Sequence, residues 1–257
     1  DAELRSAVQA RAQGHPGFAV GWVRDWVRRG LLQSGADGLT LAPEVGPDAL
    51  PATLAVAWVE RINGVLSALP PEGAQFLQLA GLLGRSVDEL LWAAVCDDPL
   101  GEHVGHVAIR PVAARIRNQL VHGLLGAGLV VETDVGWSFR HPAIPGILEA
   151  QVHVSGWWRD ANRTVAMHVA TLPMPQHAGR LGRHWLEAGE PELAVPAFVD
   201  ALVASGRTRN VHVMLSTTAR LEQALSGALV SERDWRWGVL FRYRAFAAVL
   251  DGRVEDA

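Results

Sequence analysis

The chain has 257 residues, of which 49% are hydrophobic and 19% charged, with a net charge of −4 and a pI near 6.2. This composition is typical of a globular protein with enough apolar material for about two domains. The slight acidity argues against a general nucleic-acid binder, which is usually basic. All 23 Lys and Arg positions are Arg, which excludes enzyme classes that need a P-loop lysine or a PLP Schiff base.

The single cysteine, Cys96, excludes an intrachain disulfide and fits a reducing compartment, so we expect a cytoplasmic protein. Cys96 ends the apolar run LLWAAVC, which favours a buried, inert thiol over a nucleophile. No apolar run reaches membrane-spanning length, so we expect no membrane partner. A chain that starts at Asp1 is expected to be a piece of a longer polypeptide.

The first 48 residues predict one helix followed by a linker. In GHPGFAVGWVRDWVRRGLL, Pro16 suits the first turn of a helix, and Trp22 and Trp26 recur at helical spacing. The stretch SGADGLTLAPEVGPDALP then predicts a turn, a short strand at 39–41 and a Pro/Gly-rich linker. We therefore predict a first domain over 1–48.

Residues 49–152 predict a second domain. Its first three helices cover 51–69, 70–84 and 86–95, and Ser86 and Glu89 have the spacing of a capping box. A longer helix over 109–128 carries Val112, Ile116, Leu120 and Leu124 on one side. Two short strands, 129–133 and 137–140, follow around a DVG turn. Helices followed by such a hairpin are the layout of a winged-helix domain.

The remaining residues, 153–257, predict helices joined by short turns. Two of them, 176–189 and 190–206, predict an antiparallel pair, in which Pro196 should kink the second helix or mark an error in its bounds. Helix pairs of this length favour tetratricopeptide-like repeats. The predicted fold class is mainly α: a lid helix, a winged-helix domain with a small β-hairpin, and a helical-repeat arm.

This order of elements, with Gly14, His15 and Pro16 as a Gly-x-Pro motif, resembles the STAND ATPases, a family of multidomain signal-transduction ATPases. The chain is similar in particular to the C-terminal part of bacterial regulators that join an ATPase module to tetratricopeptide-like repeats. The resemblance implies that residues 1–48 close the nucleotide-binding module as its lid. It also implies that the winged helix and the repeats connect the nucleotide state to a sensor arm.

The resemblance further implies which residues touch nucleotide. Pro16 would pack against the adenine ring, and His141, in Phe-Arg-His-Pro where the family has a Met-His-Asp-like motif, would read the phosphates of ADP. Read from the residues alone, Pro16 can equally start a helix, and His141 can cap a helix or bond a carbonyl. Both readings stay open at this point.

No Gly-x-x-x-x-Gly-Lys loop and no Walker B strand occur in the chain, so the resemblance places the ATPase core upstream of Asp1. The expected function is therefore that of a non-catalytic regulatory fragment, with ADP or ATP bound by the full-length parent and no cofactor held tightly here. The expected partners are the ATPase core in cis, a protein or ligand on the helical arm, and further copies of the chain when the parent is active.

One alternative is a DNA-binding winged-helix regulator. Arg110, Arg115 and Arg117 lie on the helix that would enter the major groove, but that helix is mostly apolar, which favours contact with protein or nucleotide over DNA.

A metal site is the remaining sequence-level candidate. His103 and His106 in HVGH have a spacing that permits a shared metal, but no Cys or acidic pair accompanies them, so a polar loop without metal is expected.

Overall fold

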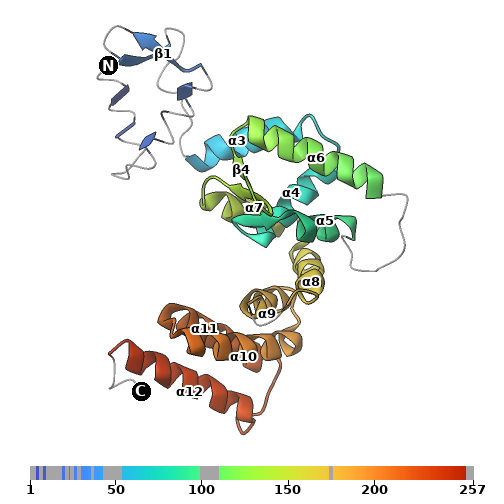
Figure 1. Cartoon of the computed structure of the whole chain (residues 1–257), viewed down its shortest axis with the longest axis vertical. Coiled ribbons are helices and arrows are strands. Elements are labelled where there is room, and N and C mark those ends of the chain that lie inside the picture. The colour runs from blue at the N-terminus through green and yellow to red at the C-terminus, as the bar shows by residue number, and fades with distance from the viewer. Residues whose placement is uncertain are drawn as a thin grey trace.

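The computed structural model describes residues 4–5, 8–9, 19–20, 23, 26–27, 30–35, 38–42, 54–98, 110–173 and 176–252. Within these ranges the chain is mainly helical, as predicted, with small antiparallel sheets (Figure 1). Among the described residues, no helix combines the length and the apolar character that crossing a membrane requires.

A short antiparallel hairpin lies near the N-terminus. It pairs β1 (Leu32–Gly35) with β2 (Gly38–Leu41), so the strand predicted at 39–41 is confirmed as part of β2. Leu32 of this hairpin is buried in a small hydrophobic cluster with Trp26 and Ala57. The hairpin therefore packs with residues of the first long helix, α3.

In the central part of the chain, which we call the sheet region, the described residues (54–98 and 110–154) form five helices and three strands. They are α3 (Leu54–Leu66), α4 (Glu72–Leu83), β3 (Ser86–Asp88), α5 (Glu89–Asp97), α6 (Arg110–Gly126), β4 (Val130–Thr133), β5 (Gly136–Phe139) and α7 (Ala143–Val154). The strands form one antiparallel sheet in the order β3-β5-β4. The two strands predicted from the sequence are β4 and β5, and the third, β3, was not predicted.

The capping box predicted at Ser86 and Glu89 is wrong. Ser86 belongs to β3, where it pairs with Ser138 of β5. The N-cap of α5 is Asp88, whose side chain accepts a hydrogen bond from the backbone N–H of Leu91 at 2.9 Å. The helix therefore begins three residues later than predicted, and the residues before it complete the sheet.

The core of the sheet region is built from large aromatic side chains. Trp92 of α5 meets Trp137 of β5 edge-on with ring centroids 5.2 Å apart, and Trp137 meets Phe139 in the same way at 5.1 Å. Ile116, Leu120 and Leu124 of α6 are buried against this core as predicted, whereas Val112 is 51% exposed. The buried stripe of α6 thus starts at Ala113, which is 3% exposed, rather than at Val112.

Helices continue through the rest of the described chain, as far as Leu250. They are α8 (Trp158–Val169), α9 (Ala178–Glu187), α10 (Pro191–Thr208), α11 (Val211–Gly227) and α12 (Trp235–Leu250). Each of the last four packs against its neighbour in the chain, and we call α9 to α12 the hairpin region. Pro196 lies inside α10 without ending it, so α10 extends as one element two residues beyond its predicted end.

The main hydrophobic core extends from the sheet region into the hairpin region, which also has a smaller cluster of its own. The largest buried cluster contains Leu148 of α7, Val165 of α8, Leu181 of α9 and Ala197 of α10. In Figure 1, α8 and α9 connect the green sheet region to the orange and red helices α10 to α12. The core therefore continues across residue 152, where the sequence analysis placed a domain boundary.

Candidate functional site

His141, the predicted phosphate-sensing residue, lies between the end of β5 and the start of α7. Its Nδ1 accepts a hydrogen bond from the backbone N–H of Ala143, the first residue of α7, at 3.2 Å. Its ring lies against the ring of Trp58 from α3, with centroids 4.2 Å apart and an angle of 35° between the planes. His141 therefore caps a helix, which was one of its two readings from the sequence.

Partial burial lowers the pKa of His141, and the nearby positive charge of Arg85 lowers it further. The ring is therefore neutral at pH 7. Because Nδ1 accepts the hydrogen bond from Ala143, the neutral ring carries its hydrogen on Nε2. An imidazole beside an arginine is a combination of groups that can interact with a phosphate.

Pro16, the other predicted nucleotide contact, lies outside the described residues, as do Gly14 and His15. Whether Pro16 and His141 face one site stays a prediction. His103 and His106 also lie outside the described residues. Among the residues that are described, no group of three or more His, Cys, Asp or Glu side chains is arranged to hold a metal ion.

The three arginines of the DNA-binding alternative differ in their surroundings. Arg117 is 7% exposed and forms an ion pair with Asp97 of α5, so it faces the interior. Arg115 is exposed on α6, and the side chain of Arg110 lies outside the described part. Burial of Arg117 removes one of the three cations that a phosphate backbone would need.

Cys96 is 3% exposed within the main core, and burial raises the pKa of its thiol well above the ordinary value. A nucleophilic cysteine needs the opposite shift, because the thiolate is the reactive form. The expectation of a buried thiol at this position is confirmed.

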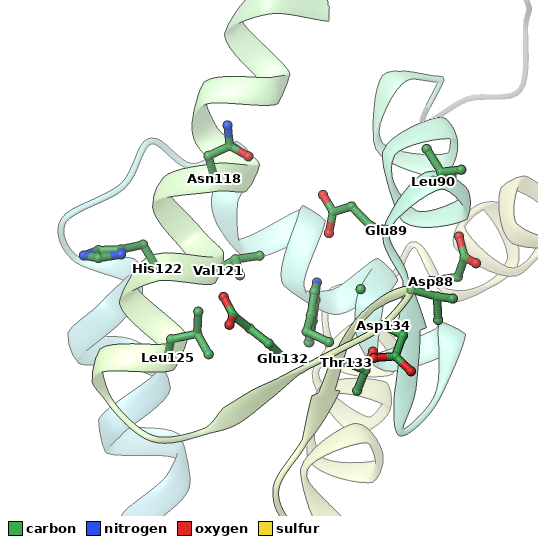
Figure 2. A pocket seen from close by; sticks show the side chains of 13 residues that line it. Asp88, Glu89, Leu90, Asn118, Val121, His122, Leu125, Glu132, Thr133 and Asp134 are labelled. Atoms are coloured by element: carbon green, nitrogen blue, oxygen red, sulfur yellow. The ribbon is translucent and has the colours of Figure 1, made fainter.

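An open cleft of about 880 Å³ lies between α6, the start of α5 and the β4–β5 hairpin, and the sequence analysis did not predict it. Four carboxylates are among its described lining residues, and no arginine is: the carboxylates belong to Asp88, Glu89, Glu132 and Asp134. Figure 2 shows the carboxyl groups of Glu89 and Glu132 turned toward the space beside α6, and the other two carboxylates farther from that helix. The opposite wall is α6, from which Asn118, Val121, His122 and Leu125 line the cleft, with the ring of His122 turned away from the carboxylates in Figure 2.

Glu89 and Trp137 meet at the base of this cleft. Partial burial raises the pKa of Glu89, although the positive charge of Arg117 and the indole N–H of Trp137 oppose that rise. Trp137 is 1% exposed, and its Nε1 is buried without completing a hydrogen bond of good geometry. The indole N–H thus lies near the Glu89 carboxylate without being fully satisfied by it.

A second polar group is buried where the two regions meet. His184 of α9 is fully buried, and its Nδ1 lies 2.8 Å from Oδ1 of Asn162 on α8. Burial lowers the pKa of His184 well below its ordinary value, and the charges of Arg183, Arg180 and Arg220 act in the same direction. His184 is therefore neutral, with Nδ1 as the donor to Asn162.

The adjacent residue, Arg183, connects the regions directly. Its guanidinium donates to the backbone carbonyl of Leu82, at the end of α4, at 2.9 Å, and to the Glu149 carboxylate on α7 at 3.1 Å. One side chain of the hairpin region thus holds two helices of the sheet region.

Comparisons with models of known protein families, with curated proteins and with solved structures found no match to this chain.

Proposed function

We propose that the chain is a non-catalytic regulatory arm of a STAND-type ATPase, in which a winged-helix domain and tetratricopeptide-like helical hairpins couple nucleotide state to sensing. ADP or ATP would be held mainly by an ATPase core elsewhere in the parent polypeptide. The helical hairpins would receive a protein or ligand signal.

The order of elements in the sheet region supports the winged-helix part of this proposal. From α4 onward the order is helix, strand, helix, helix, strand, strand, and the sheet order is β3-β5-β4. A winged helix also needs a third strand, which precedes its second helix and pairs with the hairpin. β3 has this position, because it precedes α5 and pairs with β5.

The observation that carries the coupling role is the continuous junction between the two regions. The shared core and the two bonds of Arg183 resist independent movement of α9 relative to α4 and α7. A rigid junction transmits a displacement of the helical arm to the sheet region. Such a switch operates only if a ligand binds two states of the arm with different affinities.

His141 supports the nucleotide part of the proposal by its chemistry. Its ring lies against Trp58 and accepts a hydrogen bond from the N–H of Ala143, and Arg85 adds positive charge nearby. A bound phosphate would favour the protonated ring and raise the pKa of His141.

The DNA-binding alternative is weakened by the acidic cleft. In a DNA-binding winged helix, α6 would enter the major groove and the hairpin would lie beside the phosphate backbone. Four carboxylates between these two elements would repel phosphates.

The decisive measurement is calorimetric titration of ADP into the parent polypeptide that carries the ATPase core. We expect tight binding in the wild type, weakening of about tenfold in His141→Ala through the lost charge-assisted hydrogen bond, and no change in His212→Ala, which alters an exposed histidine on α11. Equal ADP affinity in all three proteins would remove His141 from the site. Absence of ADP binding would overturn the STAND assignment.

A further inference from the structure

The described lining of the cleft between α6 and the β4–β5 hairpin has four carboxylates and no arginine or lysine. Asp88 is engaged as the N-cap of α5, but Glu89 and Glu132 have no ion-pair partner among the described residues. Glu132 lies directly opposite Trp137 in the β4–β5 register, which places its carboxylate on the same face of the sheet as the indole above Glu89. Two carboxylates that face one cavity favour a cationic ligand.

The buried indole of Trp137 provides a second, independent indication. It lines the cleft, is almost fully buried, and its N–H lacks a well-formed hydrogen bond. A buried donor left unsatisfied is costly, so a ligand that brings an acceptor to it is stabilised. The favoured ligand therefore combines a positive charge with a hydrogen-bond acceptor.

The walls of the cleft indicate that the ligand also has apolar parts. Leu90 and Val135 line it and are 82% and 65% exposed, and Val121 and Leu125 of α6 contribute further apolar surface. The long aliphatic stems of arginine and lysine pack on such surfaces while their charged ends reach carboxylates. A metal ion would use none of this apolar surface.

We infer that this cleft binds a polypeptide segment of a partner protein through an arginine or lysine side chain, whose cationic group lies between Glu89 and Glu132. A backbone carbonyl of the same segment would accept the Trp137 N–H. A peptide supplies all three features at once, whereas a simple amine lacks the acceptor and a nucleic acid has the wrong charge. The inference does not depend on nucleotide binding by the parent protein.

The test begins with a displayed library of random octapeptides, selected on the wild-type chain. Individual binders are then titrated against the wild type and the variants Glu89→Gln, Glu132→Gln and their double mutant. Glu192→Gln is the matched control, because Glu192 is an exposed glutamate on α10, far along the chain from the cleft. A 20-base-pair DNA duplex is titrated in parallel, and thermal unfolding verifies that every variant is folded.

We expect the selected peptides to be enriched in Arg or Lys, and their affinity to fall about tenfold in each single variant and further in the double variant, since a charge-assisted bond is lost each time. The control should bind like the wild type, and binding should weaken as salt rises. The inference would be overturned if the selected peptides were not enriched in Arg or Lys, or if the double variant bound them as tightly as the wild type. It would also be overturned if the DNA duplex bound the wild type and the same substitutions abolished that binding.

Indole NMR gives a readout at Trp137 itself. The protein is labelled with ¹⁵N at its tryptophan side chains. The Nε1 signal of Trp137 is assigned as the one that is missing from the spectrum of Trp137→Phe. We expect this signal to shift when peptide is added. An unchanged signal at saturating peptide would contradict placement of the segment at the base of this cleft.

Discussion

The sheet region and the hairpin region fill their interiors with different side chains. In the sheet region, helices pack on a small sheet and leave wide spaces, which Trp92, Trp137 and Phe139 occupy. In the hairpin region, helices approach closely, and alanines and a glycine lie at the contacts with Phe198 and the leucines. We therefore expect the sheet region to be destabilised most by substitutions that remove side-chain volume, and the hairpin region by substitutions that add it.

The largest expected effect is on the aromatic core. Trp92 is fully buried, and its indole N–H donates to the carbonyl of Phe76 at 2.9 Å. We expect Trp92→Ala to lower the free energy of unfolding by about 3–5 kcal/mol, as is usual for removal of a buried aromatic side chain. Urea unfolding measures this loss, with Trp235→Ala, whose side chain is 67% exposed, as the control. Similar losses in both variants would show that the sheet core does not dominate stability.

A smaller but opposite type of damage is expected in the hairpin region. A Cβ added at Gly182 would lie 2.7 Å from two ring carbons of Phe198, which is itself buried. We expect Gly182→Ala to cost about 1–3 kcal/mol despite the better helix propensity of alanine. Gly238→Ala in α12 meets no atom within 4 Å and should stabilise the chain by up to about 1 kcal/mol. The denaturant midpoints of Gly182→Ala and Gly238→Ala measure both changes. A midpoint for Gly182→Ala at or above that of the wild type would show that the close contact between α9 and α10 does not require glycine.

The buried histidine between the two regions should make stability depend on pH. The pKa of His184 is lower in the folded chain than when unfolded, so below about pH 6.5 the unfolded chain binds a proton that the folded chain does not. Stability should therefore fall as the pH drops from 7.5 to 5.5, by up to about 1.4 kcal/mol per pH unit below 6.5.

Urea unfolding at three pH values tests this dependence. His184→Leu should be less stable at pH 7.5 but should show a shallower decline with acid, while His212→Asn on the exposed face of α11 should keep the wild-type slope. An unchanged slope in His184→Leu would assign the acid sensitivity to other groups, such as His141, whose pKa is also lowered.

The smallest effect is expected at the cleft. Burial raises the pKa of Glu89, so its charge is unfavourable in the folded chain, and replacing it by an isosteric amide removes that cost. We expect Glu89→Gln to change the free energy of unfolding at pH 7 by less than about 0.5 kcal/mol. A clear loss of stability on thermal unfolding would mean that Glu89 supports the fold rather than serving a ligand.

The sequence was informative wherever structure depends on neighbouring residues. The helical spacing of Ile116, Leu120 and Leu124 and the β-branched run before the DVG turn predicted α6 and the β4–β5 hairpin almost to the residue. His141 was recognised as a possible helix cap because it stands directly before a helix. In each case the deciding signal lies within a few positions of the element.

The sequence was misleading where structure depends on distant residues. The pattern of Ser86 and Glu89 fits a capping box, but Val87 pairs with Trp137, fifty positions later in the chain, and so belongs to a strand. The acidic cleft was missed for the same reason, since its carboxylates come from the start of α5 and from the hairpin. No local pattern indicates that such segments meet.

The burial of Cys96 has a practical consequence for measuring movement. Because its thiol lies in the core and resists ionisation, maleimide dyes should react selectively with cysteines introduced on the surface. A pair such as Glu72→Cys at the start of α4 and Glu232→Cys just before α12 would report the distance between the sheet region and the end of the arm by energy transfer between single dye pairs. The native cysteine can stay in place, so the arm can be observed in a chain whose interior is unaltered.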